Sequence, residues 1–192
     1  MLYKLLILLL IEKLYNRYLN TQVSKMVNLN NNFIVGQHVV YPSHGVGIIR
    51  ALEQNNFAGL NLYVYVIHFK NPTLELKVPK EQAIKNGLRS VSNSADFNKA
   101  LLILSGEKVV PNSTLWNKRV KAYMSKLNSG DIFTISLLIK ELYPNLFNPS
   151  RSFSEKIIFD DAITRLSAEY AITHDIGIEA AKKEITNILD KS

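Results

Sequence analysis

Between residues 33 and 79 the hydrophobic positions alternate with polar ones, as is typical of β-strands. Each apolar run is rich in β-branched and aromatic residues and ends at glycine, proline or asparagine, which favour turns. Strands are predicted over residues 33–42, 48–54, 62–69 and 74–79, with a short closing segment at 87–91. Residues 43–47 and 55–59 are predicted to be a turn and a loop. Short strands at this regular spacing predict a small SH3- or Tudor-like β-barrel.

From about residue 97 the hydrophobic period becomes that of helices. Five helices are predicted, over residues 97–104, 115–128, 132–142, 153–173 and 178–189. Ser113, Asp131 and Ser152 are predicted N-caps, and Ser152 with Glu155 matches a capping box. The fourth helix carries an apolar stripe made of Ile158, Ala162, Leu166 and Tyr170. The predicted fold class is therefore α+β, with a barrel over residues 28–92 and an all-helical domain over residues 93–192.

Residues 1–27 form an N-terminal extension outside these two domains. Its apolar run, Leu5–Ile11, is too short to cross a bilayer, which takes about 20 residues. A basic residue precedes the run, as in a signal peptide, but no small-residue cleavage site follows it. We expect that translation begins at Met26 or that residues 1–25 form a dispensable amphipathic helix.

The net charge of the chain indicates which kind of molecule it binds. The 192 residues carry a formal net charge of +7, and the sequence pI is about 9.5. A basic balance suits a polyanionic partner such as nucleic acid. One stretch of basic residues has only Glu107 among them: Lys99, Lys108, Lys118, Arg119, Lys121 and Lys126. The absence of cysteine excludes disulfides, thiolate nucleophiles and cysteine-ligated zinc.

The sequence holds no recognisable catalytic or phosphate-loop motif. His38 and His68 are interpreted as satisfied residues inside strands, and His44 as a residue that hydrogen-bonds the turn. Asp160 and Asp161 are neighbours on a helix and point about 100° apart, so they cannot share a proton. We therefore expect no catalytic site, no cofactor and no metal, and a protein that is not an enzyme.

The segment that indicates a function is Thr114–Tyr123, which holds the single tryptophan, Trp116, beside three cations. Lys118 and Lys121 share a helical face with Ser125, which suits contact with a phosphate backbone. Trp116 is suited to stack on a base or to wedge at a base step. It also belongs to an apolar stripe with Val120, Tyr123, Met124 and Leu127. Spacing alone favours a core position for Trp116 over a DNA wedge.

Two sets of motifs carry a family resemblance. The first set is Phe33-x-Val35-Gly36-x-x-Val39-Val40-Tyr41-Pro42-x-His44-Gly45-Val46-Gly47, followed by Gly59, Tyr63, Tyr65, Val78-Pro79 and Gly87-Leu88-Arg89. The second set is Trp116-Asn117-Lys118-Arg119, Lys126-Leu127-x-Ser129-Gly130-Asp131, Ser154-Glu155 and Leu166-x-x-Glu169. Over about residues 33–190 the chain thus resembles the CarD/CdnL family of bacterial RNA-polymerase-binding transcription regulators.

The resemblance implies that the barrel binds the RNA polymerase β subunit by adding a strand edge, a known mode of recognition. The same barrel type occurs in the transcription-repair coupling factor. The helical domain would contact promoter DNA at the upstream edge of the bubble, where Trp116 wedges into the minor groove and stabilises the open complex. The implied DNA-binding residues are Trp116, Lys118, Arg119 and Lys121. The implied polymerase-binding residues are Lys77 and Asn55, the latter uncharged where the family has a basic residue.

These implied partners predict a cytoplasmic protein, monomeric in the absence of polymerase and without membrane contact. The alternative is a general basic nucleic-acid-binding module that makes no polymerase contact.

Overall fold

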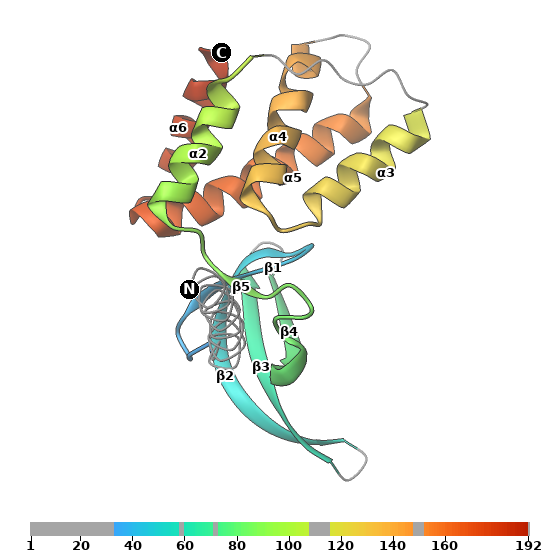
Figure 1. Ribbon diagram of the computed structural model, residues 1–192, viewed down its shortest axis with the longest axis vertical. Coiled ribbons are helices and arrows are strands. Elements are labelled where there is room, and N and C mark those ends of the chain that lie inside the picture. Colours follow the sequence, from blue (N-terminus) through green and yellow to red (C-terminus); the bar gives the residue numbers. More distant parts are fainter. Residues whose placement is uncertain (1–32, 58–59, 71–72, 108–115, 148–151, 192) are drawn as a thin grey trace, which may run out of the picture. The chain divides into compact units, whose positions relative to one another are not determined.

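The computed structural model describes residues 33–57, 60–70, 73–107, 116–147 and 152–191 (Figure 1). The chain separates into two units, Met1–Ile34 and Val35–Ser192, and the second contains every strand and helix described below. The predictions for residues 1–27, the Ser113 cap and the Gly59 motif position lie outside the described residues.

Five antiparallel strands form one sheet in the order β4-β3-β2-β1-β5. The strands are β1 (His38–Tyr41), β2 (Gly45–Phe57), β3 (Leu60–Lys70), β4 (Thr73–Pro79) and β5 (Arg89–Ser90). A single 3-10 turn, η1 (Lys80–Gln82), lies between β4 and β5. The sheet is open, with β4 and β5 at its two edges. A five-stranded antiparallel sheet followed by helices confirms the predicted fold class.

Several strand boundaries differ from the predicted ones, most of all in β1 and β2. The predicted turn at residues 43–47 is partly strand, because β2 already begins at Gly45. The backbone of Gly36 has a φ of 89° and turns the chain, so β1 is shorter than the predicted strand over residues 33–42. The predicted loop at residues 55–59 begins as strand, because β2 continues to Phe57. The Asn56 side-chain amide donates to the Asn61 side-chain oxygen, 3.1 Å away on the paired strand. Such a cross-strand pair offsets the low strand preference of asparagine.

Gly47 lets β2 pack tightly beneath side chains of β3. A Cβ added at Gly47 would lie 2.8 Å from a carbon of Ile67 and 2.8 Å from a carbon of Phe69. Both of these residues are buried in the sheet core. The buried hydrophobic residues of the sheet and its connections after Gly36 are Val39, Val40, Ile49, Val64, Tyr65, Val66, Ile67, Phe69, Val78, Ala83 and Leu88.

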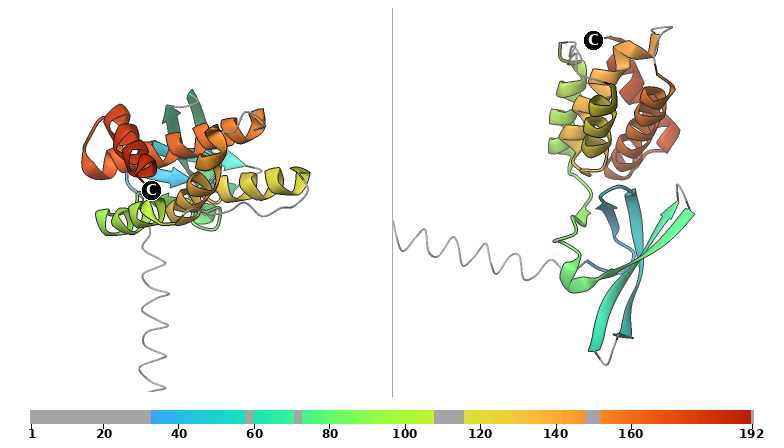
Figure 2. Two further views of the ribbon diagram at one scale, coloured as in Figure 1. Left: turned by 90° about the horizontal axis from the view of Figure 1, so that it is seen from above. Right: turned by 90° about the vertical axis from the view of Figure 1, so that its right-hand side faces the viewer.

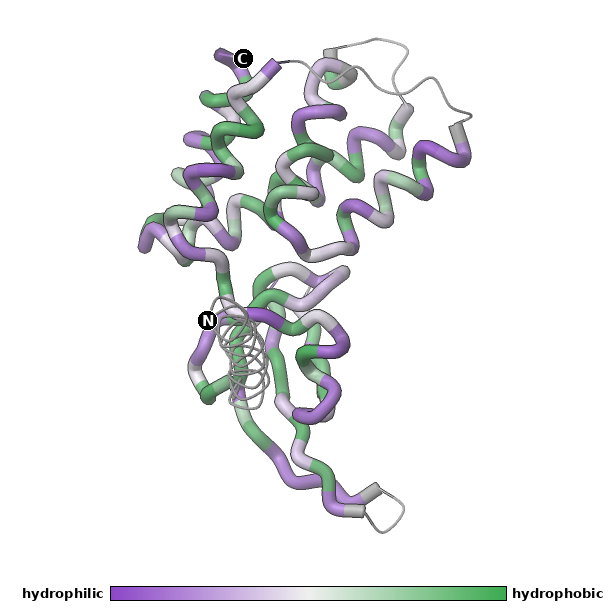
Figure 3. The backbone as a smooth tube through the Cα atoms, in the orientation of Figure 1, coloured by the Kyte–Doolittle hydropathy of each residue, from purple (hydrophilic) through white to green (hydrophobic). Residues whose placement is uncertain are grey.

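Five α-helices follow the sheet and pack beside one another (Figure 2). They are α2 (Ser94–Ser105), α3 (Trp116–Leu127), α4 (Ile132–Leu142), α5 (Phe153–His174) and α6 (Ile178–Asp190), with the 3-10 segment η2 (Tyr143–Phe147) after α4. Hydrophobic and hydrophilic residues alternate along these helices, as expected where each buries one face (Figure 3). The predicted stripe on α5 is buried in their shared core: Ile158, Ala162, Leu166 and Tyr170.

The helix starts follow their capping residues. Asn93 accepts a hydrogen bond from the Asp96 backbone N–H at 2.8 Å, so α2 begins before the predicted residue 97. Asp131 caps α4 as predicted, through the backbone N–H of Thr134. Ser152 caps α5 by accepting from the Ser154 backbone N–H. Among the described residues, no helix is both long enough and apolar enough to cross a membrane.

We expect Gly47→Ala to lower the free energy of unfolding by about 1–3 kcal/mol, the usual cost of overpacking a core. The added methyl group would have to displace Ile67 and Phe69. Urea denaturation followed by circular dichroism measures the change. Gly106→Ala is the matched control, because its Cβ would meet only ordinary contacts of 3.4 and 3.5 Å. Equal stability of the two variants would contradict the tight packing of β2 on β3.

Candidate functional site

The two residues implied to bind polymerase lie on one face of the sheet. Lys77 on β4 is opposite Val66 on β3, which is in turn opposite Ala51 on β2. Asn55 lies four residues after Ala51 on the same strand. Because strand residues an even number of positions apart share a face, Asn55 and Lys77 face the same side.

Lys77 is not an isolated charge. Its Nζ atom donates to the Glu53 carboxylate at 2.7 Å, and both side chains are exposed to solvent. The hydrogen bond to Glu53 and the charge of Glu53 raise the pKa of Lys77 above its usual range, so Lys77 remains a cation. Glu53 was not identified from the sequence, because its partner lies two strands away.

The open sheet has backbone edges that a further strand can reach. β1 pairs with β2 only from Gly45 to Ile48, and no described strand pairs with the same edge of β2 beyond Ala51. β4, which carries Lys77, lies at another edge. Unpaired backbone N–H and C=O groups on such edges are the groups that strand addition uses.

The residues implied to bind DNA lie on α3 but differ in their surroundings. Lys118 and Lys121 are exposed, as is Ser125 on the predicted shared face. Arg119 is 3.4 Å from the Glu155 carboxylate of α5, and its side chain is only 29% exposed. Trp116 is the first residue of α3, and its side chain lies outside the described residues.

The inner side of α3 is fixed to the helical core. Tyr123 and Leu127 are buried, as their stripe predicts, whereas Met124 is 41% exposed. Lys126 donates to the Glu141 carboxylate of α4 at 2.6 Å. Burial, followed by the charge of Glu141, raises the pKa of Tyr123 to about 12, so its hydroxyl stays neutral near pH 7. These contacts leave Lys118 and Lys121 on the solvent side.

Glu155 has a different role from the one its position predicts. The capping-box prediction assigns the Glu155 carboxylate to the start of its own helix, but in the structure it pairs with Arg119 of α3. Glu155 is 4% exposed, so this ion pair joins two helices at a largely buried position.

His38 and His68 lie inside β1 and β3, as the sequence interpretation places them. His38 is exposed and His68 half-buried, and both lie opposite Ile48 of β2. Neither is therefore a fully buried core residue. The His44 backbone N–H donates to the Tyr41 carbonyl at 3.1 Å, so this residue hydrogen-bonds the turn through its backbone.

The neighbouring aspartates on α5 do not face each other as a pair. The Asp161 carboxylate accepts two hydrogen bonds from Arg165, at 3.0 and 2.8 Å, while Asp160 is exposed. Within the described ranges, no group of three or more His, Cys, Asp or Glu residues is placed to hold a metal ion.

An ion pair with a buried carboxylate connects the last strand of the sheet to α5, at a place that we call the junction. The Arg89 guanidinium binds both carboxylate oxygens of Glu169, at 2.6 and 2.9 Å, and Glu169 is 3% exposed. Arg89 also donates twice to the carbonyl oxygen of Gly130, at 3.0 and 2.6 Å. The Ser92 backbone N–H donates to Glu169, and the Thr173 hydroxyl donates to the Ser92 carbonyl, each at 2.8 Å. The junction consists of Arg89, Ser92, Gly130, Glu169 and Thr173.

Glycines and a proline surround the junction. A Cβ at Gly87 would lie 2.5 Å from Pro42, and one at Gly130 would lie 3.4 Å from it. Both glycines have positive φ values, 85° and 70°, which side chains rarely allow. Gly45 also has a positive φ, 74°, and a Cβ added there would meet the Arg165 side chain.

Residues of four resemblance motifs therefore meet at one place. They are Pro42 and Gly45 of the first turn, Gly87 just before β5 and Arg89 at its start, Gly130 before α4, and Glu169 on α5. The sequence predicted a turn at Gly45, but it did not reveal that these motifs lie together. Arg89 and Glu169 are separated by 80 residues in the sequence, so no local pattern reveals their contact.

We expect Arg89→Ala to lower the free energy of unfolding by about 3 kcal/mol, because it leaves the Glu169 carboxylate buried without its cation. Urea denaturation of the purified chain measures the loss. Arg50→Ala is the matched control, since it removes the same side chain from an exposed position and should change stability by less than about 0.5 kcal/mol. A similar stability of the two variants would show that the ion pair does not hold the junction.

Comparison with known proteins finds two domain families in this chain. Residues 33–92 match the CarD-like/TRCF RID domain, and residues 99–186 match the CarD C-terminal domain. The Bacillus subtilis (strain 168) protein YdeB, whose name describes it as a proposed transcription factor, is 24% identical over 147 residues. The aligned region covers 75% of this chain and 94% of YdeB. With both domains present in the order of the structure, the chain belongs to the CarD family.

Proposed function

We propose that this chain is a transcription regulator that binds the RNA polymerase β subunit and promoter DNA and stabilises the open promoter complex. The observation that carries the proposal is that a CarD-like/TRCF RID domain and a CarD C-terminal domain occupy one chain. The name of the similar protein YdeB also supports a role in transcription. The proposed role is binding without catalysis, in the cytoplasm, where bacterial RNA polymerase works.

The sheet offers the features that a polymerase contact requires. Lys77 and Glu53 form an exposed ion pair, and Asn55 lies on the same face. The adjacent open edges supply backbone groups for an added strand. Backbone hydrogen bonds would provide the affinity, and the side chains on this face would provide the specificity.

The exposed side of α3 supports the DNA contact. Lys118 and Lys121 are free to reach phosphates, and the first turn of α3 contains no acidic residue. Phosphate groups are favoured near a helix N-terminus, where backbone N–H groups are unpaired. Trp116 begins this helix, and its aromatic ring is the group proposed to wedge at an unstacked base step. Arg119 contributes by holding α3 to α5 through Glu155.

Stabilisation of the open complex requires a difference in affinity. A protein that bound closed and open DNA equally would shift nothing, whereas a ring inserted at an unstacked junction binds open DNA better. Attachment to polymerase raises the local concentration of α3 near the promoter, so that a weak DNA contact suffices. The gain in local concentration requires that the sheet and α3 bind polymerase and DNA at the same time. The junction favours simultaneous binding because it holds the sheet against α5.

We expect Trp116→Ala to shorten the lifetime of the open complex by about tenfold, since aromatic–base stacking contributes about 1–3 kcal/mol. The measurement is the decay of preformed open complexes, with purified polymerase, after addition of a competitor. The variant should keep the circular dichroism spectrum of the parent chain. Phe153→Ala is the control, because it removes an aromatic ring that is 76% exposed on α5. Unfolding of the helices by Trp116→Ala would instead identify Trp116 as a core residue.

We expect Lys77→Glu to weaken binding to the polymerase β subunit by at least about tenfold, since it replaces a rim cation with a like charge beside Glu53. Binding of the free chain to promoter DNA should stay unchanged. Surface plasmon resonance on immobilised β subunit, with a DNA-binding titration in parallel, measures both. Lys85→Glu reverses an exposed charge in the same domain and serves as the control.

The same two assays separate the proposal from its alternative. A chain that binds DNA but never retains the β subunit would be a general nucleic-acid-binding module. An equal loss of DNA and polymerase binding in Lys77→Glu would contradict separate surfaces for the two partners.

A further inference from the structure

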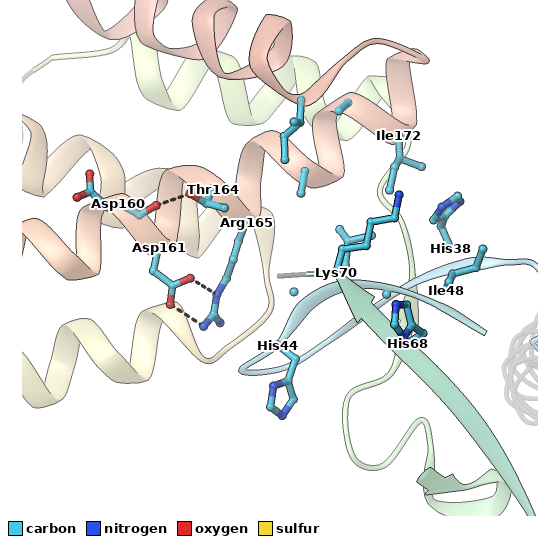
Figure 4. A pocket seen from close by; sticks show the side chains of 16 residues that line it. His38, His44, Ile48, His68, Lys70, Asp160, Asp161, Thr164, Arg165 and Ile172 are labelled. Carbon is cyan, nitrogen blue, oxygen red and sulfur yellow. Dashed lines mark hydrogen bonds and ion pairs between the residues drawn. The ribbon is translucent and has the colours of Figure 1, made fainter. Parts of the chain in front are cut away.

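A pocket of about 600 Å³ lies between the sheet and α5, outside both proposed interfaces (Figure 4). Its floor comes from β1, β2 and β3, and its roof comes from α5 and the first residue of α6. A volume of this size is within the range of sites that hold small molecules. The resemblance gives this pocket no role, and nothing in the polymerase and DNA proposal uses it.

One end of the pocket gathers basic groups. His38 and His68 lie opposite Ile48 from either side, and Lys70 follows His68 on the same face of β3. Figure 4 shows Lys70 and the two imidazoles around this end. Within the part of the chain that the structure describes, these three side chains form no hydrogen bond or ion pair. Glu75, opposite His68 on β4, is the acidic group that faces this row.

The other end of the pocket is acidic, and one of its two aspartates is paired with an arginine. Asp160 and Asp161 lie there, away from Lys70 (Figure 4). Arg165 holds Asp161 through two hydrogen bonds and also donates to the Leu127 carbonyl at 3.2 Å, so its own charge is already used. An anionic ligand group would therefore be attracted to the end formed by His38, His68 and Lys70.

The walls between the two ends are apolar. Val46 lines the floor between the two ends, Ile48 continues it to the basic end, and Ala168, Ala171 and Ile172 of α5 line the roof, with Ile178 of α6 at the margin. Aliphatic surfaces on two sides of a slot suit a flat ring system, whose faces they can cover. Basic groups at one end suit a phosphate, which accepts charge-assisted hydrogen bonds.

From these features we infer that the pocket binds a nucleoside phosphate, with the phosphate near Lys70 and the base along the apolar wall beside Ala168. The ligand would contact the sheet and α5 together, directly beside the junction. Binding would therefore stabilise the arrangement in which Arg89 meets Glu169, in proportion to the ligand's affinity for the folded chain. This inference is independent of the proposed transcription role, because it concerns the free chain.

Isothermal titration of the full chain with ATP and with GTP tests the inference, with inorganic phosphate as the probe that carries charge alone. We expect saturable binding of at least one nucleotide with a Kd below about 1 mM. Lys70→Ala should weaken it by at least about tenfold, through loss of a charge-assisted contact. Ala168→Leu should weaken it as strongly by filling the slot. Lys85→Ala removes an exposed lysine outside the pocket and outside both proposed interfaces, and it should leave the affinity unchanged.

Three results would overturn the inference. The first is no saturable binding of either nucleotide up to about 10 mM, well above the affinity expected for a built site. The second is an equal loss of affinity in Lys70→Ala and Lys85→Ala, which would indicate attraction to general basic charge. The third is binding of inorganic phosphate as tight as that of the nucleotides, or full affinity in Ala168→Leu, which would exclude the apolar slot. Melting curves of each variant confirm that it is folded.

Discussion

The ion pair between the half-buried Arg89 and the buried Glu169 is the interaction on which the arrangement of sheet and helices depends. A carboxylate that is almost completely buried is costly unless its oxygens are satisfied. Here both oxygens of Glu169 are bound by the Arg89 guanidinium, and one also accepts from the Ser92 backbone N–H. A planar fork meets two oxygens in a single orientation, so the pair specifies direction as well as proximity. Apolar contact by itself would tolerate rotation of α5 against the sheet.

Close backbone approach allows this ion pair to form. Gly87 and Gly130 both approach Pro42, and Arg89 reaches the Gly130 carbonyl from β5. A Cβ at Gly87 would collide with Pro42, and the positive φ of both glycines disfavours any side chain. The first turn of the sheet, the last strand and the helical domain are thus joined where side chains are smallest. In the proposed function, the junction fixes the position of the residues proposed to bind polymerase relative to α3. Simultaneous binding through two surfaces requires such a fixed relation.

Local patterns predicted the elements well because each element's period reflects its own buried face. The helix over residues 132–142 was predicted with the limits that α4 has, since Asp131 caps its start. Strand boundaries were predicted wrongly where a single backbone conformation or cross-strand hydrogen bond changed the length of the strand. The positive φ of Gly36 shortened β1, and the Asn56–Asn61 pair extended β2 into a predicted loop. Neither event has a periodic signature.

The candidate site was predicted only in part. The sequence identified Lys118 and Lys121 as helical surface cations, and the structure places both in solvent. It did not reveal that Arg119 pairs with Glu155, or that Lys77 pairs with Glu53. A basic residue in the sequence indicates a charge, but its environment depends on which distant acid packs beside it. Electrostatic partners in different elements are therefore not visible from composition or spacing.

By itself the sequence determined the α+β class, the helix caps, the basic segment before residue 127 and the family motifs. Only the tertiary structure decided what several of those motifs are for. It brought Arg89 to Glu169 across 80 residues, and it placed His38 and His68 in one pocket beneath α5. The physical reason is that strand and helix periods come from neighbouring residues, which the sequence lists in order. Burial of a charge or the lining of a pocket comes from residues that folding alone makes neighbours.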